Sequence, residues 1–216
     1  MSWSVNSSGT LSATVGTPST LATITSAGVY QLWVDLSNMV LGDLFQVWGT
    51  YKIDGSNARR FWSGFYQHAQ VNTAILTPPV PVNANALAFV VEQFAGTSRN
   101  FPWQILSQAT PWIVDGSGST TPTVGTPSTL YTESTSGTIA AWVDTANMVN
   151  GDLTSFYSTY QVDGSNARQF DKGTFQHAQQ NPGKLWIPTP IYNSKAFLIN
   201  QTAGTARAYP YQILRV

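Results

Sequence analysis

A repeated hexapeptide is the feature that most constrains this chain. The string DGSNAR begins at Asp54 and again at Asp163. It belongs to a longer repeat, because residues 14–70 recur at an offset of 109 residues, with TVGTPSTL, WVD, NMV, GDL and QHAQ in the same order. Near the end of the chain the offset falls to 108, where Gly96 matches Gly204. Two copies this similar are expected to share one fold.

The length of the repeat sets the expected domain organisation. Stacked repeats have periods of roughly 20–50 residues, so a much longer period indicates a domain in each copy. We expect an N-terminal arm at 1–13, a first domain at 14–107, a linker at 108–122 and a second domain at 123–216. The linker is assigned because it is rich in Ser, Thr, Gly and Pro.

Within each copy the sequence pattern favours strands over helices. The segments GVYQLWVDL (28–36) and DLFQVWGTYKI (43–53) are rich in Val, Trp, Tyr and Phe, and apolar residues recur with period two. Turn-forming stretches such as SNMVLGD, DGSN and AGTSRN separate the segments. The expected fold class is all-β, with two tandem β-sandwich domains of jelly-roll type related by internal duplication.

The chain carries little charge, which narrows the range of partners. Only 9% of its residues are charged, against about 25% in typical domains, and ten basic residues balance ten acidic ones. We therefore expect neither a nucleic-acid nor a membrane partner. The sequence has no cysteine, which excludes thiol catalysis, disulfides and thiolate metal sites. The N-terminus lacks the pattern of a secretory signal, so the chain is expected to be soluble and made without one.

The repeated DGSN stretch has two interpretations. Between two strands it is typical of a hairpin turn, in which Gly55 and Gly164 take positive φ. A calcium loop is the alternative, but only Asp54, Ser56 and Asn57 could serve as ligands, and no acidic residue follows at loop spacing. We favour the turn and expect no metal.

Four repeated titratable residues are interpreted as structural braces. His68 and His177 occupy equivalent positions, and no second histidine or neighbouring acid completes an acid–base or metal site in either copy. We expect hydrogen-bonded histidines, with a pH-sensitive contact between the two copies as the alternative. Arg59 and Arg168 follow the repeated turn and are expected to brace each domain, with contact to a partner as the alternative.

The sequence contains no arrangement that indicates catalysis. No serine lies in a strand–turn–helix elbow, no phosphate-binding glycine loop precedes a helix, and no pair of carboxylates suits glycoside hydrolysis. We therefore expect a protein that is not an enzyme and needs no cofactor.

Differences in polarity between the copies indicate a candidate partner interface. Apolar residues of the first copy are replaced in the second by polar ones, or by the smaller alanine at Leu32/Ala141, and the other pairs are Ile24/Glu133, Leu41/Asn150, Phe45/Thr154, Trp62/Asp171, Phe65/Thr174 and Phe94/Thr202. A shared core is not expected to tolerate changes such as Trp to Asp, so these positions are predicted to be exposed. Exposed apolar patches mark interfaces. The candidate interface comprises Ile24, Leu41, Phe45, Trp48, Trp62 and Phe65, with packing against the second copy as the alternative.

Two longer stretches carry a resemblance to a known class of proteins. GVYQLWVDLSNMVLGDLFQV, its counterpart GTIAAWVDTANMVNGDL, and the closing AGTSRNFPWQIL and AGTARAYPYQILRV resemble small β-sandwich virion proteins of tailed bacteriophages. The resemblance covers each copy nearly end to end. Many such proteins are capsid decoration, or cement, proteins, and a single unit is their usual form, from which the tandem duplication departs.

The resemblance implies a structural virion protein that binds the outside of the capsid and stabilises the head. The expected partners are the major capsid protein and other virion proteins, with a homo-oligomer as a further expectation. The expected location is the capsid surface after synthesis in the host cytoplasm. The alternative function is a carbohydrate- or receptor-binding module of a tail or fibre, because eight tryptophans provide faces on which sugars stack. A concave groove lined by Trp48 and Trp62 would favour that alternative.

Overall fold

The computed structural model describes residues 2–109, 112–161 and 165–216. All regular secondary structure in these residues is β-strand, which confirms the expected all-β class. The second copy of the DGSNAR turn begins at 163, so Asp163 and Gly164 lie outside the described residues. None of the described residues forms a helix long and apolar enough to span a membrane.

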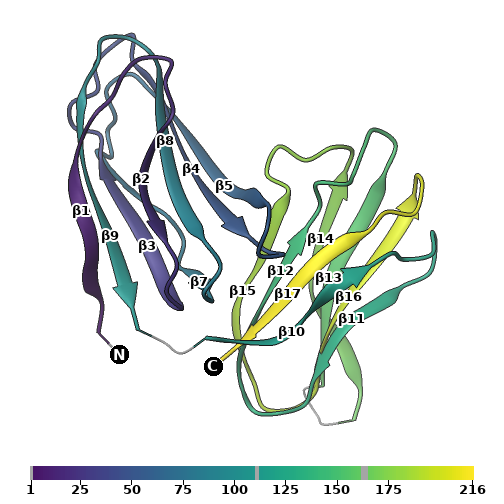
Figure 1. Ribbon diagram of the computed structural model, residues 1–216. Helices are drawn as coiled ribbons and strands as arrows, with labels where there is room; N and C mark the ends of the chain where they lie inside the picture. Colours follow the sequence, from purple (N-terminus) through teal and green to yellow (C-terminus); the bar gives the residue numbers. More distant parts are fainter. Residues whose placement is uncertain (1, 110–111, 162–164) are drawn as a thin grey trace. The chain divides into compact units, whose positions relative to one another are not determined.

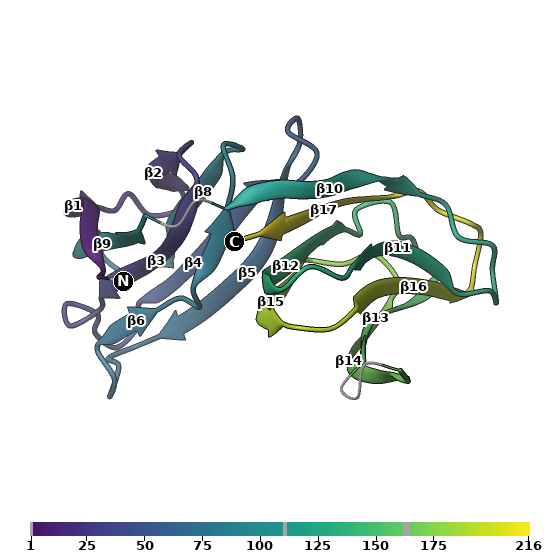
Figure 2. The same cartoon turned by 90° about the horizontal axis from the view of Figure 1, so that it is seen from below.

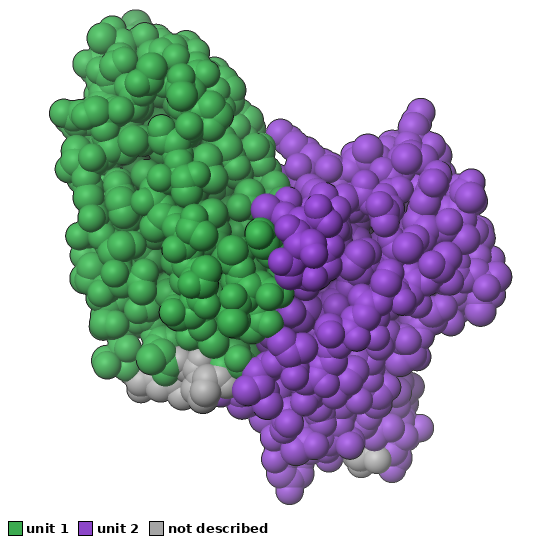
Figure 3. All heavy atoms as spheres, viewed as in Figure 1, with its two compact units in different colours: residues 1–52, 60–112 green, residues 53–59, 113–216 purple. Residues whose placement is uncertain are grey.

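The chain divides into two compact units, which Figure 3 shows in separate colours. Unit 1 contains Met1–Lys52 and Arg60–Trp112, and unit 2 contains Ile53–Arg59 and Ile113–Val216. The short segment Ile53–Arg59, which includes the first DGSN turn, is thus grouped with unit 2 although it belongs to the first copy of the repeat.

The first copy of the repeat forms nine strands in two antiparallel sheets (Figure 1). One sheet has the order β1-β9-β3-β6, with β7 also pairing with β3, and the other has the order β2-β8-β4-β5. The strands are β1 (Ser4–Ser12), β2 (Ser19–Ile24), β3 (Gly28–Asp35), β4 (Leu44–Lys52), β5 (Ala58–Gln67), β6 (Ala74–Leu76), β7 (Val80–Val82), β8 (Leu87–Ala95) and β9 (Asn100–Gln108).

The described residues of the second copy repeat this topology with eight strands (Figure 2). Its sheets have the orders β10-β17-β12-β15 and β11-β16-β13-β14, so the single strand β15 takes the place of β6 and β7. Both copies therefore show the double-sheet arrangement of a jelly roll. The strands are β10 (Ile113–Thr120), β11 (Ser128–Glu133), β12 (Gly137–Asp144), β13 (Leu153–Gln161), β14 (Ala167–Gln176), β15 (Gly183–Ile191), β16 (Lys195–Ala203) and β17 (Tyr209–Arg215).

The expected arm and linker are wrong, because each contains the first strand of a sandwich. In the 1–13 segment β1 pairs with β9, and Ser4 lies opposite Ser107. In the 108–122 segment β10 pairs with β17, and Ile113 lies opposite Arg215. Both are outer strands of their sheets, held mainly by backbone hydrogen bonds, and most residues of β1 are exposed. Such strands lack the apolar alternation by which strands are found in a sequence.

Each core lies between the two sheets of one sandwich. The alternating burial of β8, from Leu87 to Ala95, shows how one face of each strand points inward. In unit 2 the buried cluster is built by Leu130, Ile139, Ala141, Val143, Met148, Phe156, Trp186, Ile191, Phe197, Ile199, Tyr209 and Ile213.

Candidate functional site

One buried carboxylate in each unit joins the loops at one end of the sandwich. In unit 1, Asp43 accepts hydrogen bonds from the Val40 N–H at 2.9 Å, the Thr97 N–H at 3.3 Å and the Arg99 Nε at 3.1 Å. In unit 2, Asp152 makes the same three contacts with the equivalent residues. Burial opposes ionisation of Asp152, but its hydrogen bonds outweigh burial and lower its pKa.

The two histidines brace the same loops. The His68 N–H donates to the Asp43 carbonyl at 2.8 Å, and His68 Nδ1 accepts the Gly42 N–H at 3.0 Å. His177 makes the equivalent bonds in unit 2. Both histidines have φ of 58°, in the left-handed region that non-glycine residues rarely adopt. Among the described residues, no group of three or more His, Cys, Asp or Glu could hold a metal ion.

The first DGSN segment forms the expected turn. Asp54 Oδ1 accepts the N–H groups of Ser56 and Asn57, each at 2.8 Å, and Gly55 has φ of 78°. Bonds from an Asp side chain to the following backbone are typical of such turns.

The arginines differ from the expected pattern. Arg59 Nε donates to Asp144 Oδ2 at 2.5 Å within unit 2, whereas Arg168 is exposed. The repeated arginines that reach a buried acid in the loops are Arg99 and Arg207. Their presence in both AGTSR and AGTAR is the sequence signal for this role.

Three of the six residues expected at a partner interface lie in the interior instead. Ile24, Phe45 and Trp48 are buried. The Trp48 ring is covered by the Arg60 guanidinium, whose carbon lies 4.3 Å from the ring centroid. Trp62 is half-buried. Trp48 and Trp62 therefore do not provide the open aromatic groove that would favour sugar binding at those two residues.

The expectation failed at Ile24 and Phe45 because the second copy keeps their counterparts, Glu133 and Thr154, buried with different chemistry. Phe45 packs on Phe101, with ring centroids 4.3 Å apart, whereas the equivalent Thr154 and Tyr209 hydroxyls are hydrogen-bonded at 2.7 Å. A difference in polarity between equivalent residues of the two copies therefore does not show whether their position is exposed or buried.

The remaining candidates, Leu41 and Phe65, are exposed at one end of unit 1. Their side chains are 83% and 52% exposed, and Phe94 is 41% exposed with its ring centroid 6.3 Å from that of Phe65. Val71, which was not among the predicted interface residues, is fully exposed. We call Leu41, Phe65, Val71 and Phe94 the apolar tip. Their counterparts in unit 2 are all polar, namely Asn150, Thr174, Gln180 and Thr202.

Local hydrogen bonding explains why the apolar tip residues gather at one end. Leu41 and Val71 lie in the β3–β4 and β5–β6 connections, which the bond between Gly42 and His68 joins. Phe94 stands beside Ala95, which pairs with Leu44 at the start of β4. Figure 1 shows these connections at the same end of the sandwich.

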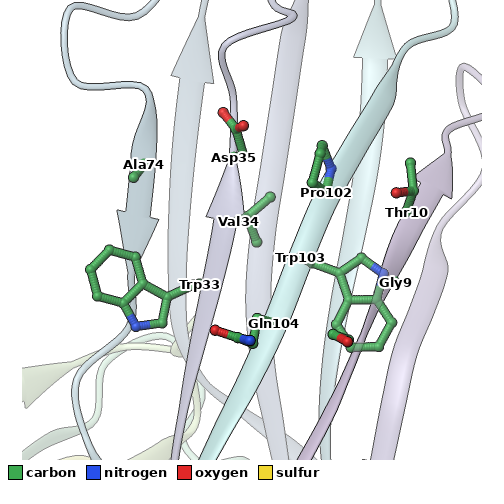
Figure 4. A pocket seen from close by; sticks show the side chains of 10 residues that line it. Gly9, Thr10, Trp33, Val34, Asp35, Ala74, Pro102, Trp103 and Gln104 are labelled. Atoms are coloured by element: carbon green, nitrogen blue, oxygen red, sulfur yellow. The ribbon is translucent and has the colours of Figure 1, made fainter. Parts of the chain in front are cut away.

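A groove of about 480 Å³ lies on the β1-β9-β3-β6 sheet of unit 1 (Figure 4). Trp33 is 39% exposed, and its outward direction follows from the alternation of β3, in which Leu32 and Val34 are buried. The Trp103 ring packs over Gly9, where an added Cβ would lie 3.2 Å from the ring. The residues that line the groove are Ser8, Gly9, Thr10, Trp33, Val34, Asp35, Ala74, Pro102, Trp103 and Gln104.

Unit 2 contains a charged cluster that unit 1 lacks. The Tyr131 hydroxyl donates to Asp115 Oδ2 at 2.7 Å, and Arg215 Nε lies 3.1 Å from Asp115 Oδ1 and 3.8 Å from Glu133 Oε2. Burial, followed by the neighbouring carboxylates, raises the pKa of Tyr131. Hydrogen bonding with Asp115 lowers the pKa of Glu133 to about 2. The cluster forms internal ion pairs and hydrogen bonds.

Comparison with known proteins found similarity only among solved structures. No protein-family model and no curated protein sequence matches the chain. The PBSX exported protein XepA aligns over 100% of this chain and 86% of its own, with a TM-score of 0.35 and 8% identity. The tandem CBM22 domains of Paenibacillus barcinonensis Xyn10C align over 99% and 93%, with a TM-score of 0.30 and 8% identity. The infectious bursal disease virus VP2 particle aligns over 89% and 58%, with a TM-score of 0.31 and 12% identity.

Proposed function

We propose that this chain is a non-catalytic structural protein of a tailed-bacteriophage virion, and that it binds the outside of the capsid through the apolar tip of unit 1. The observation that carries the proposal is the set of four exposed apolar side chains whose counterparts in unit 2 are all polar. The resemblance of both copies to decoration proteins supports it. Viral capsid domains and lectin domains both have the jelly-roll fold, so the proposal rests on the exposed residues of the site and not on the fold.

The apolar tip suits a protein surface as its partner. Exposed apolar groups at the end of a sandwich release water when they meet a complementary surface. Complete burial of the four side chains would contribute roughly 5 kcal/mol before the cost of association is subtracted. An energy of this size is useful when many copies bind a repeating shell. A ligand that binds only the assembled shell stabilises that shell by mass action.

The duplication adds a second domain without repeating the apolar tip. Unit 2 carries Asn150, Thr174, Gln180 and Thr202 where unit 1 carries the tip residues. Under this proposal unit 1 anchors the chain on the capsid, and unit 2 presents polar residues at the positions equivalent to the tip or binds a second site with the advantage of being tethered.

The test replaces each apolar tip residue of unit 1 with its polar counterpart from unit 2. The variant combines Leu41→Asn, Phe65→Thr, Val71→Gln and Phe94→Thr. Its binding is measured by co-sedimentation with DNA-filled heads of the encoding phage, prepared without this protein. We expect binding to weaken at least a hundredfold while the circular dichroism spectrum and melting temperature stay close to those of the wild type.

The matched control places changes at equivalent positions of unit 2, with Asn150→Ala and Gln180→Ala combined, and is expected to bind heads normally. Binding of the folded tip variant at the wild-type level would contradict the proposal. So would wild-type protein that sediments with purified tails and leaves heads in the supernatant unbound.

A further inference from the structure

The outer face of the β1-β9-β3 sheet in unit 1 carries a regular arrangement of apolar and polar side chains. Trp33 lies directly opposite Gln104 in the β3–β9 pairing. The next pair joins Val34 and Trp103, and beyond it Asp35 on β3 and Pro102 on β9 also line the groove. Diagonal neighbours on adjacent strands lie about 7–8 Å apart at their Cα atoms. The two apolar rings therefore stand on one diagonal, and the carboxylate and the amide stand on the other.

Strand β1 extends this surface with hydroxyl groups. Ser8 pairs with Gln104, and Thr10 pairs with Pro102. Figure 4 shows Trp33 and Ala74 toward one side of the groove and Thr10 toward the other, with Asp35, Pro102 and Gln104 between them. An aromatic ring, a proline ring, a carboxylate, an amide and two hydroxyls thus share one open surface.

The polar groups of the groove are available to a ligand. Asp35 is half-buried and receives the Ser37 N–H on Oδ1 at 2.8 Å, and within the described part of the chain it forms no ion pair. That bond engages Oδ1, and Asp35 is among the residues that line the groove. Gln104 is half-buried, and its amide can donate and accept.

We propose that this groove binds a neutral carbohydrate, in the form of a short stretch of hexopyranose polymer. A hexopyranose presents a C–H face that packs on an aromatic ring and a rim of hydroxyls that bond to carboxylates and amides. The alternation of Trp33 and Pro102 with Asp35 and Gln104 matches both features at once. A volume of about 480 Å³ lies within the usual range for small-molecule sites.

Other ligand classes fit the groove less well. Its lining contains no lysine or arginine and one carboxylate, so phosphate groups and acidic sugars would be repelled. The central strands β9 and β3 are each paired on both sides, so the floor of the groove offers no free strand edge for an added peptide strand. A neutral polyol is the class that uses both the apolar rings and the polar groups.

The site differs from the apolar tip, so the two proposals fail separately. The test uses native gel electrophoresis through hydroxyethylcellulose, mannan, glucomannan and dextran, followed by calorimetry with hexasaccharides of whichever polymer retards the full chain. We expect at least one polymer to retard the wild type. Trp33→Ala should weaken binding at least tenfold, whereas Trp33→Tyr, which keeps a stacking face, should retain most of the affinity.

Two further variants separate a binding role from a structural one. Asp35→Asn keeps the shape of the side chain and is expected to change affinity without lowering the melting temperature by more than a few degrees. Phe65→Thr, in the apolar tip, should bind sugar as the wild type does. The proposal is overturned if none of the four polymers retards the wild type, or if folded Trp33→Ala binds with unchanged affinity.

Discussion

Replacing Asp43 with alanine should destabilise unit 1 and leave unit 2 unchanged. Asp43 is buried and joins three segments of the chain, because its carboxylate accepts hydrogen bonds from Val40, Thr97 and Arg99. Alanine removes all three acceptor contacts at once. The two backbone N–H groups and the guanidinium would then face a cavity in place of a charge.

The magnitude follows from the contacts. Removing one partner of a fully buried ion pair costs about 3–5 kcal/mol. Arg99 is 28% exposed at its side chain, so water compensates part of that loss and the lower limit applies. The two N–H groups lose an acceptor at about 1 kcal/mol each, and this cost overlaps with that of the ion pair. We therefore expect a loss of about 3 kcal/mol in the free energy of unfolding, which corresponds to a midpoint shift of roughly 1.5 M urea.

Hydrogen exchange measured by mass spectrometry across a urea series follows the two units separately. Peptides from β3, β4 and β8 should exchange at lower urea in Asp43→Ala, and peptides from β12, β13 and β16 should not change. Asp152→Ala is the matched variant and should reverse this pattern, because Asp152 makes the equivalent contacts. Asp43→Asn keeps a carbonyl oxygen for the N–H groups and should lose less stability. A shift below about 0.5 kcal/mol in unit 1, or an equal shift in both units, would refute the reasoning.

Two other predictions concern pH. The low pKa of Glu133, caused mainly by hydrogen bonding with Asp115, means that its contribution to stability is present above the unfolded pKa of about 4.3 and is lost as pH falls toward about 2. Glu133→Gln should therefore reduce the loss of unit 2 stability between pH 5 and 2, and an unchanged acid unfolding curve would contradict this. Burial lowers the pKa of Lys195 to about 8, so unit 2 should gain stability as pH rises from 8 to 10. Lys195→Leu, which introduces the residue found at Leu87, should raise the free energy of unfolding at pH 7 by about 1–3 kcal/mol and reduce that gain, and a lower stability at pH 7 would refute the assignment.

The repeat and the strand pattern were sufficient to predict the fold. Identity between the copies required one fold for both, and period-two apolar residues such as Val47, Tyr51 and Ile53 identified the inward faces of strands, where all three side chains are buried. The first strand of each sandwich could not be found this way. Residues 4–12 and 113–120 are rich in Ser, Gly and Thr, and their strands depend on backbone pairing with β9 and β17.

The candidate sites were only partly predictable, because they depend on which face of a strand is covered. Leu41 and Phe65 are exposed, but Phe45 and Trp48 are buried. The groove around Trp33 was not predicted from the sequence, because the predicted interface rests on differences between the copies and Trp33 has an identical counterpart in Trp142. A binding surface whose residues are the same in both copies cannot be found by looking for positions at which the copies differ.

The substitutions between the two copies follow one pattern at buried positions and another at exposed positions. In the core, substitutions occur in pairs across neighbouring strands. Ile24 lies opposite Leu87 in unit 1, and their counterparts Glu133 and Lys195 lie opposite each other in unit 2, all four being buried. A buried carboxylate without partners would cost several kcal/mol, and Glu133 is compensated by the nearby Arg215 guanidinium and by the N–H groups of Ser134 and Thr135.

The apolar tip shows the opposite pattern. Phe65 and Phe94 contact each other, yet their counterparts Thr174 and Thr202 bond separately, to Ser155 and to the Leu153 carbonyl. All four tip positions change in the same direction, from apolar to polar, and all four remain exposed in unit 1. Packing within unit 1 does not require apolar residues at exposed positions, so contact with a binding partner explains these residues better. A partner that contacts the tip positions of unit 1, and not the equivalent positions of unit 2, would explain why only unit 1 has apolar residues there.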